Sequence, residues 1–331
     1  MLILSAADVR RALPMPQAIK AMKRAFASLS EGRTLVPPRT HLPVVRHAGV
    51  TLVMPAFIDA PSPADQALAV KVVSVFDHNA QRGLPRIQAA VLACDPETGQ
   101  PRALLEGAAL TAIRTAAASG AATDFLARPD SQVLAMFGAG VQARAHVEAM
   151  CAVRPIRTVY VYCRSPARCR AFIEELQPAC GAKMEWVVAQ SPQQALKHAD
   201  IVCTATTSSR AVFDDTDVGR GVHLNAIGAY TPETCEIPAE TVRRAAVFVD
   251  NREAAWTDAG DLIQPFRAGL VDRGCIVADL GELALGRHSG RADSREITLF
   301  KSVGLAVQDA VAARCTLENA RRLNLGREVD W

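Results

Sequence analysis

The sequence predicts an α/β protein in which a doubly wound parallel sheet is joined to a discontinuous α+β domain. From Gln132 onward, short apolar segments alternate with helical segments, which is the pattern of a parallel sheet covered by helices on both faces. Before Gln132, apolar segments are separated by turn signals, which indicates a mainly antiparallel sheet. A length of 331 residues is enough for two such domains.

The N-terminal half begins with helical periodicity and continues as strands. A helix is expected from its cap, Ser5, to about Ser30, with Gly32 as its stop. Asp95–Gln100 has the composition of a hairpin turn. The small residues of Leu105–Leu126 predict one or two buried helices. The expected strands are Arg39–Val45, Gly49–Met54, Ala67–Phe76 and Ile87–Asp95.

In the C-terminal half, strands and helices alternate up to about Phe300. A long helix, Leu305–Arg322, follows the last expected strand, and we expect it to fold back onto the N-terminal half. The predicted domains are therefore residues 1–120 with 305–331, and residues 121–304. The expected strands are Gln132–Phe137, Thr158–Tyr162, Met184–Val188, Ile201–Thr204, Val222–Ile227, Ala246–Val249 and Ile297–Phe300. The expected helices between them include Pro166–Leu176 and Ser191–His198.

A glycine-rich turn stands directly between the first of these strands and a helix. The strand is followed by Gly138, Ala139, Gly140, Val141, Gln142 and Ala143, the pattern G-x-G-x-x-A. The first glycine permits a tight turn, the second lets the backbone approach a pyrophosphate, and the small Ala143 lets helix and strand pack closely. The helix N-terminus also presents free N–H groups to phosphates. This indicates a Rossmann-type dinucleotide site, the alternative being a tight turn that holds no ligand.

The end of the second strand indicates which dinucleotide is bound. Enzymes of this fold that use NAD carry an acidic residue there, roughly 20 residues beyond the glycines, which binds the ribose 2′-hydroxyl. Here the segment contains no acid, and Arg164, Ser165 and Arg168 lie where a 2′-phosphate would bind. We therefore expect NADPH as the cofactor, with NADH as the alternative. The arginines could otherwise be solvated charges around the start of a helix.

Composition and charge exclude several classes of protein. The net charge of +3 is small and dispersed, without a basic stripe for nucleic acid. No apolar run is long enough to span a membrane, and the first residues do not read as a signal peptide. The nine cysteines form no C-x-x-C pair and no zinc spacing. We expect a cytoplasmic protein with reduced thiols, no metal site, no nucleic-acid partner and no membrane partner.

Eight segments distributed along the chain form a recognisable set. They are Met54–Ala56, Lys71–Val73, Gly83–Pro85, Leu110–Ala117, Phe137–Ala143, Ala199–Val202, Asn225–Ala229 and Phe300–Gly304. In combination they resemble the ornithine cyclodeaminase/mu-crystallin family over nearly the whole chain. The resemblance implies that residues 1–120 and 305–331 form a substrate-binding and dimerisation domain beside a Rossmann domain, and that two substrate domains join in a homodimer.

The family's substrates are small α-amino or α-imino carboxylates, and the resemblance implies that Arg39, Lys71 and Arg114 hold the carboxylate. The residues themselves agree, because Lys71 interrupts an apolar strand and Arg114 is the lone charge in a helix of small residues. Three converging cations require an anion, which a substrate carboxylate provides. For each residue alone, an ion pair with an internal acid is the alternative. Asp309 is expected to cap or pair within the last helix, with at most a supporting role.

The resemblance also extends the expected cofactor contacts beyond the glycine turn and the second strand. The nicotinamide is expected across the ends of the parallel strands, near Gly228 and near the segment that follows the last strand. The added contacts are Thr115, Thr204, Ala205, Thr206, Gly228, Ser302, Val303 and Gly304.

Two positions depart from the cyclodeaminase pattern. Tyr230 stands where cyclodeaminases carry an aspartate that handles the side-chain amine of the substrate, and Leu52 stands where they carry a glutamate. Such a pocket suits a substrate without a distal charge. The expected function is the NAD(P)H-dependent reduction of a cyclic ketimine, 1-pyrroline-2-carboxylate or 1-piperideine-2-carboxylate, to L-proline or L-pipecolate. Lys71, Tyr230 or a bound water would handle the proton.

Two alternatives remain open. One is another enzyme of the family: ornithine cyclodeaminase, which forms L-proline and ammonia from L-ornithine, or an alanine or N-alkyl amino acid dehydrogenase. The other is a non-catalytic NADP-dependent ligand-binding protein, the role in which mu-crystallin serves. The basic residues argue against binding alone, because catalysis on a small carboxylate needs them.

Overall fold

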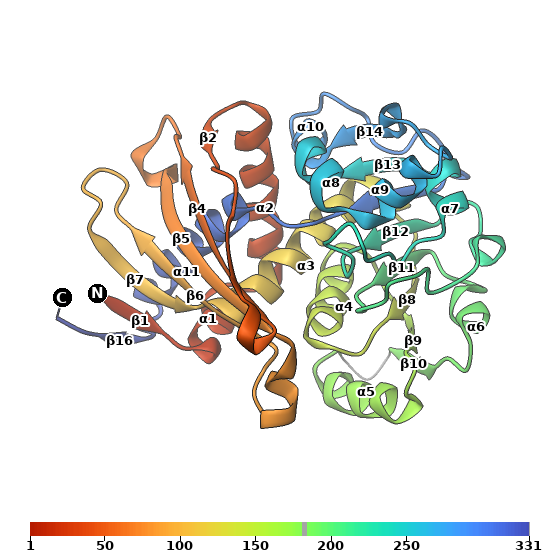
Figure 1. The fold of residues 1–331 in the computed structure, drawn as a ribbon, viewed down its shortest axis with the longest axis horizontal. Helices are drawn as coiled ribbons and strands as arrows, with labels where there is room; N and C mark the ends of the chain where they lie inside the picture. Colours follow the sequence, from red (N-terminus) through yellow and green to blue (C-terminus); the bar gives the residue numbers. More distant parts are fainter. Residues whose placement is uncertain (181–183, 331) are drawn as a thin grey trace. The chain divides into compact units, whose positions relative to one another are not determined.

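The computed structural model describes residues 1–180 and 184–330, and their contacts divide the chain into two compact units (Figure 1). The first unit combines Met1–Thr115 with the C-terminal segment that starts at Gly304. The second unit is the continuous segment Ala116–Val303. One unit contains a mainly antiparallel sheet and the other a parallel sheet, so the fold class expected from the sequence is confirmed.

The sheet of the first unit has the strand order β16-β1-β7-β6-β5-β4-β2, and β3 pairs with β4. These neighbours are antiparallel except β1 and β7, which run parallel. Strands β4 and β5 pair along their whole length, so that Met54 lies opposite Lys71. The strands are β1 (Leu2–Leu4), β2 (Thr34–Leu35), β3 (Thr40–Val44), β4 (Gly49–Ile58), β5 (Ala67–Phe76), β6 (Ile87–Cys94), β7 (Pro101–Glu106) and β16 (Arg327–Glu328).

A proline divides the first helical segment of the sequence in two. Helix α1 (Ala6–Ala12) ends before Pro14 and α2 (Met15–Ser30) starts after it, because proline has no backbone N–H to donate within a helix. The expectation of one continuous helix is therefore wrong. The expected cap is confirmed: the Ser5 hydroxyl accepts from the N–H of Asp8, whose carboxylate accepts from the N–H of Ser5 in return.

The run of small residues that starts at Leu105 turns from strand into helix at Gly107. The first two residues of this run end β7, so the expectation of a helix is wrong for them. The other residues form α3 (Gly107–Leu126), as expected. The Glu106 carboxylate accepts from two N–H groups of the first turn at 3.0 and 2.7 Å. Gly107 is required because a Cβ there would lie 2.7 Å from the backbone of Ala89. Helix α3 carries the chain from the first unit into the second.

Helix α11 (Ala306–Arg322) packs against α2, β4, β5 and β6, so helices cover one face of the first unit's sheet. In β5, for example, alternate residues from Ala67 to Val73 point to this face and are buried. The opposite face carries apolar side chains that this chain covers only in part or leaves exposed. They include Leu68, Val70, Val72, Leu92 and Leu104.

The sheet of the second unit has the strand order β10-β9-β8-β11-β12-β15-β13-β14, and its strands pair in parallel. The chain order reverses between β8 and β11, which creates the switch point at which such sheets bind ligands. Each expected strand is found, whereas β14 was not expected because it is short and only partly apolar. The strands are β8 (Val133–Phe137), β9 (Thr158–Tyr162), β10 (Glu185–Val188), β11 (Ile201–Thr204), β12 (His223–Ala226), β13 (Ala246–Val249), β14 (Ile276–Asp279) and β15 (Thr298–Lys301).

The helices of the second unit connect its strands and bury an apolar core that includes Val202, Leu224, Val247 and Leu299. The helices are α4 (Val141–Val153), α5 (Pro166–Cys180), α6 (Pro192–Leu196), α7 (Ala239–Arg244), α8 (Arg252–Asp258), α9 (Gly260–Arg267) and α10 (Leu280–Ala284). Short 3₁₀ turns cover Val45–His47, Pro63–Asp65, Asp77–Arg82, Asp215–Asp217 and Arg273–Cys275. None of the helices in the described ranges combines the length and the apolar character that crossing a membrane requires.

Candidate active site

Lys71 lies in the middle of β5, on the face of the sheet that α11 covers. Its neighbours on that face, Ala69 and Val73, are buried as well. The Lys71 side chain is only 2% exposed, and its Nζ lies 2.6 Å from Oδ2 of Asp309 on α11. A buried ammonium group is thus paired with a buried carboxylate.

Arg114 reaches the same carboxylate from α3. Its Nε donates to the other oxygen of Asp309, Oδ1, at 3.0 Å, and its Nη1 donates to Oε1 of Gln308 at 2.7 Å. Gln308 also accepts from the backbone N–H of Leu305 at 2.8 Å, which fixes the first turn of α11. Asp309, for which at most a supporting role was expected, therefore joins Lys71 to Arg114.

Gly304 lies next to the guanidinium groups of both Arg39 and Arg114. Nη2 of Arg39 donates to the carbonyl oxygen of Gly304 at 3.0 Å. The φ angle of Gly304 is +80°, and a Cβ at this position would lie 2.7 Å from Nη1 of Arg114. Only glycine meets both conditions. Gly304 was expected among the cofactor contacts, and the structure places it beside the residues expected to bind a carboxylate.

We call Arg39, Lys71, Arg114 and Asp309 the cation cluster, in which two buried cations face the carboxylate of Asp309. Lys71 and Arg114 share one acid. Burial lowers the pKa of Lys71 to about 8, against the opposing effect of Asp309, and Arg114 and Arg39 lower this pKa further. Nε2 of Gln308 is a buried donor without a hydrogen-bond partner among the described residues. The arrangement is suited to an anion such as a carboxylate.

Leu52 shares the sheet face of the cation cluster. It lies opposite Val73 on β5, and residues directly opposite each other in an antiparallel pair point to the same face, as Val73 and Lys71 do. An alkyl group therefore stands near the cluster where a cyclodeaminase would carry a glutamate. Tyr230 belongs to the second unit, follows β12 and is 39% exposed. Thr115, expected to contact the cofactor, bonds within α3: its hydroxyl donates to the carbonyl of Thr111 at 2.6 Å.

The glycine turn of the second unit connects β8 to α4. Gly138 has a φ of +114°, and a Cβ there would lie 2.5 Å from the carbonyl oxygen of Ala205, so this position requires glycine. A Cβ on Gly140 would meet no atom within 4 Å, which leaves open space above the turn. Helix α4 starts at Val141 without a side-chain cap, so its first N–H groups are offered to a ligand. The N–H of Gly138 donates to the carbonyl of Tyr162 at 2.9 Å, which ties the turn to the end of β9.

The segment after β9 presents basic residues and a helix cap. Arg164 and Arg168 are exposed, and the first acid of the sequence beyond β9 is Glu174, more than two helical turns into α5. The Ser165 hydroxyl accepts from the N–H of Arg168 at 3.4 Å at the start of α5. The end of β9 therefore has a positive character, as the sequence indicated.

A buried glutamate that the sequence analysis did not single out ties together two of the expected cofactor-binding segments. Glu236 is fully buried, and its carboxylate accepts from Oγ1 of Thr204 at 2.9 Å and from the N–H groups of Thr206 and Gly228, each at 2.6 Å. Gly228 must be glycine, because a Cβ would lie 2.2 Å from the carbonyl oxygen of Thr206. Burial raises the pKa of Glu236, and the nearby Asp261 raises it further. Glu236 thus fixes the spacing between the ends of β11 and β12.

Asp261 and Lys301 form a second buried pair beneath this glutamate. Oδ1 of Asp261 accepts from the N–H groups of Glu236 and Ile237 at 2.6 and 3.0 Å. Oδ2 of Asp261 lies 2.8 Å from Nζ of Lys301, and both side chains are fully buried. Nζ of Lys301 also donates to the carbonyl of Ala229 at 2.5 Å. The segment after β12 is therefore held to β15.

Asp250, at the end of β13, holds the segment that follows β15. Its Oδ2 accepts from the hydroxyl of Ser302 at 3.0 Å and from the N–H of Val303 at 2.8 Å. The expected contacts at the strand ends are thus brought to one edge of the parallel sheet. With the open space above Gly140, this edge could hold a dinucleotide.

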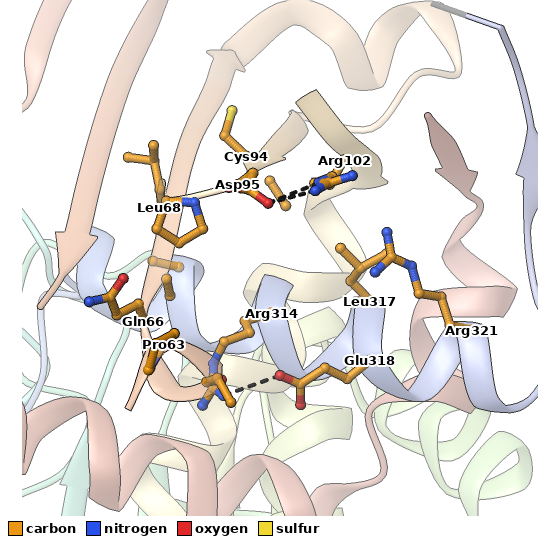
Figure 2. A pocket seen from close by; sticks show the side chains of 15 residues that line it. Pro63, Gln66, Leu68, Cys94, Asp95, Arg102, Arg314, Leu317, Glu318 and Arg321 are labelled. Carbon is orange, nitrogen blue, oxygen red and sulfur yellow. Dashed lines mark hydrogen bonds and ion pairs between the residues drawn. The ribbon is translucent and has the colours of Figure 1, made fainter. Parts of the chain in front are cut away.

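A separate cavity of about 260 Å³ lies in the first unit between the second half of α11 and the ends of β5 and β6 (Figure 2). None of the expected site residues lines it. Two of its basic groups have acidic partners, Arg102 with Asp95 and Arg314 with Glu318. We therefore keep this cavity apart from the candidate active site.

Comparisons with known proteins identify the family to which this chain is similar. A model of the ornithine cyclodeaminase/mu-crystallin family matches residues 1–324, which confirms the resemblance inferred from the sequence. The chain is 37% identical to Delta(1)-pyrroline-2-carboxylate reductase of Bacillus cereus over 332 aligned positions, covering 100% of both chains. It is 34% identical to ketimine reductase mu-crystallin of Rattus norvegicus, covering 91% of each.

A solved structure is similar over the same length. It is Thermococcus litoralis Delta(1)-pyrroline-2-carboxylate reductase in complex with NADH and L-proline. The TM-score is 0.94 at 40% sequence identity, and the match covers 99% of this chain and 100% of that one.

Proposed function

This chain belongs to the ornithine cyclodeaminase/mu-crystallin family, and from that premise we propose that it is an enzyme that reduces cyclic ketimine carboxylates with NADPH or NADH. The substrate is 1-pyrroline-2-carboxylate or its six-membered homologue 1-piperideine-2-carboxylate, and the product is L-proline or L-pipecolate. The full-length similarity to pyrroline-2-carboxylate reductases supports the reaction type.

The cation cluster is the observation that carries this proposal. Lys71 and Arg114 are buried and share the single carboxylate of Asp309, so an anionic ligand would satisfy the remaining positive charge. Leu52 gives the same sheet face an alkyl group, which suits an apolar ring and offers nothing to a distal ammonium group. A small ring with one carboxylate meets both conditions.

In the reaction, the protein's residues bind, orient and manage a proton. The reduced nicotinamide, when bound, supplies the hydride that the imine carbon accepts. Arg39, Lys71 and Arg114 hold the substrate carboxylate, and Asp309 keeps Lys71 and Arg114 in fixed positions. Because the pKa of Lys71 is lowered to about 8, its Nζ can give up or hold a proton near neutral pH at little cost. Tyr230 is the second candidate for the proton that the imine nitrogen needs.

We propose NADPH as the preferred cofactor, with NADH accepted. Gly138 to Gln142 would hold the pyrophosphate, and the exposed Arg164 with Ser165 would bind the 2′-phosphate. Thr206, Gly228 and Ser302, held by buried carboxylates, would face the nicotinamide half. Between the end of β9 and Glu174 there is no acid that would repel a phosphate.

We also propose a homodimer formed through the first unit, and a cytoplasmic location. The uncovered face of its sheet carries Leu68, Val70, Leu92, Leu104 and the 42% exposed Val72, and a second copy of the chain would bury this apolar surface. Among the described cysteines, those from Cys94 to Cys315 are free thiols, which suits a reducing compartment.

The direct test is NADPH and NADH oxidation by the purified protein with each cyclic imino acid, followed by chiral analysis of the product. We expect turnover with at least one ring size and formation of the L-amino acid. L-Ornithine serves as the second substrate: ammonia and proline from ornithine would make the protein a cyclodeaminase. Tight NADPH binding without oxidation by any imino acid would instead identify a binding protein.

A further inference from the structure

Two cysteine thiols lie in contact beside the segment proposed to bind the adenosine end of the cofactor. Sγ of Cys163, directly after β9, is 3.0 Å from Sγ of Cys169, in the first turn of α5. Cys163 is partly exposed, whereas Cys169 is 1% exposed. The two sulfurs need to approach each other by only about 1 Å to reach the length of a disulfide bond.

We propose that Cys163 and Cys169 are a peroxide-oxidisable dithiol whose disulfide form weakens NADPH binding. The formation of the bond depends on the thiols alone. Its effect on the cofactor rests on the proposed function, because it requires Arg164 and Ser165 to bind the cofactor.

The oxidation is a two-electron reaction with hydrogen peroxide as the oxidant. The thiolate of the partly exposed Cys163 attacks one peroxide oxygen, the O–O bond breaks, and Cys163 becomes a sulfenic acid while hydroxide leaves. The thiol of Cys169 then attacks this sulfur, the S–O bond breaks, and the S–S bond forms. The Cys169 proton and the released oxygen leave as water, so that two thiols and one peroxide give one disulfide and two waters.

The order of the two thiols follows from their surroundings. Burial, and secondarily the hydrogen bond between Cys169 and Cys163, raise the pKa of Cys169 to about 12, so Cys169 stays protonated at neutral pH. Cys163 is the one that solvent reaches. Cys163 is therefore the peroxide-reactive thiol, and Cys169 the resolving thiol.

The new bond would strain a segment that contacts both the proposed adenosine site and the proposed pyrophosphate site. Cys163 stands between Tyr162, whose carbonyl accepts from Gly138 of the glycine turn at 2.9 Å, and Arg164. Sγ of Cys163 also contacts the carbonyl of Ser165 at 3.2 Å. Drawing Cys163 toward α5 breaks this contact and moves Arg164 and Ser165 away from their reduced-state positions.

Peptide mapping tests the first half of the proposal. After treatment with hydrogen peroxide and alkylation of free thiols, trypsin cuts at Arg157, Arg164, Arg168 and Arg170. Residues 158–164 and 169–170 are therefore separate peptides, which a Cys163–Cys169 disulfide would join. We expect this joined product, and its disappearance after reduction. Oxidation of other cysteines without this product would overturn the proposal.

Cofactor binding to the same samples tests the second half. Loss of a charge-assisted contact to the 2′-phosphate should raise the NADPH dissociation constant on the order of tenfold or more. NADH binding should weaken less, since it has no 2′-phosphate. An oxidised, cross-linked protein that binds NADPH as tightly as the reduced one would refute the effect on the cofactor.

Three variants keep the test specific. Cys163→Ser is chosen because serine keeps a donor to the Ser165 carbonyl, and Cys169→Ala because alanine leaves no unpaired hydroxyl in a buried position. In both variants, peroxide should no longer affect NADPH binding. Cys94→Ser, in the other unit, should keep this effect. If the reduced protein binds neither nucleotide, the proposed function and the effect on the cofactor fail together, while the joined peptide still decides whether the disulfide forms.

Discussion

The cation cluster of the first unit and the strand-end network of the second unit use buried charge in opposite ways. In the cation cluster, Lys71 and Arg114 share the one carboxylate of Asp309, so cations exceed acids. In the strand-end network, the carboxylate of Glu236 accepts three hydrogen bonds from a hydroxyl and two backbone N–H groups. Asp250 likewise accepts from the hydroxyl of Ser302 and the N–H of Val303.

The difference teaches what each region contributes. A surplus of buried positive charge is costly in an empty protein and becomes favourable when an anion binds, so the cation cluster is organised for a ligand. A saturated carboxylate has no capacity left for a ligand, so Glu236 and Asp250 determine the positions of backbone segments. Substitutions in the first region should therefore act on the substrate, and substitutions in the second on the cofactor.

The largest effect is expected from removing one of the two cations that share Asp309. Lys71→Met takes away a charged donor for the substrate carboxylate and leaves Asp309 paired with Arg114 alone. We expect a loss of about 3 kcal/mol in transition-state stabilisation, so that kcat/KM for the imino acid falls on the order of a hundredfold. The NADPH dissociation constant should stay nearly unchanged. Steady-state kinetics and NADPH fluorescence titration measure the two quantities. Equal losses in both would break the division between the two regions.

Glu236→Gln should produce the reverse pattern. The amide that replaces one carboxylate oxygen carries N–H groups and faces the N–H of either Thr206 or Gly228, which leaves a buried donor unsatisfied. This costs about 1–3 kcal/mol, so the KM for NADPH should rise by roughly ten- to a hundredfold. The exposed Glu233→Gln is the matched control and should behave like the wild type. A lower melting temperature with an unchanged KM for NADPH would leave Glu236 as a purely structural residue.

Arg164→Ala addresses the cofactor preference within the second region. Loss of one guanidinium–phosphate contact should raise the KM for NADPH about tenfold and leave the KM for NADH unchanged. The exposed Arg170→Ala, two residues further than Arg168 along α5, controls for the general loss of positive charge. If NADPH and NADH respond equally, the 2′-phosphate does not bind at Arg164.

The smallest expected effect is a pH dependence that reports on the cation cluster. Lys71 is charged below its pKa of about 8, so kcat/KM should decline as the pH rises through that value. A bound carboxylate favours the charged ammonium group and raises this pKa, so the decline in kcat should occur at higher pH than the decline in kcat/KM. Lys71→Arg should remove this alkaline limb, and a limb unchanged in that variant would point to Tyr230 or the substrate.

Much of the fold could be predicted because turn residues delimit its strands. The bounds of β5, β9, β11 and β13 agree with the expected ones. An aspartate stands directly beside three of these apolar runs: Asp77 after β5, Asp200 before β11 and Asp250 after β13. The expectation failed where local composition is ambiguous. Leu105 belongs to a strand although small residues follow it, and β14 is too short to produce a pattern.

The site was predictable only where a charge stands in apolar surroundings. Lys71 and Arg114 stand out in this way, and the same reasoning applied to Asp309 within its helix of small residues would have found their partner. Glu236 stands in a segment without regular secondary structure and Asp261 in the first turn of a short helix, and in both places an acid is ordinarily solvated. Their burial arises from tertiary packing, so no local pattern reveals it.

The discontinuity of the first unit has a consequence for the order in which the chain can mature during synthesis. The ribosome releases Lys71 and Arg114 long before Asp309, which lies on the last helix. Until that helix emerges, these two cations have no acid to bury against, so the N-terminal segment cannot close its core around them. The second unit is continuous and can fold first. The C-terminal helix is therefore needed to complete the first unit. A chain terminated before residue 306 should be cleaved by proteases, although the parallel sheet of its second unit is already formed.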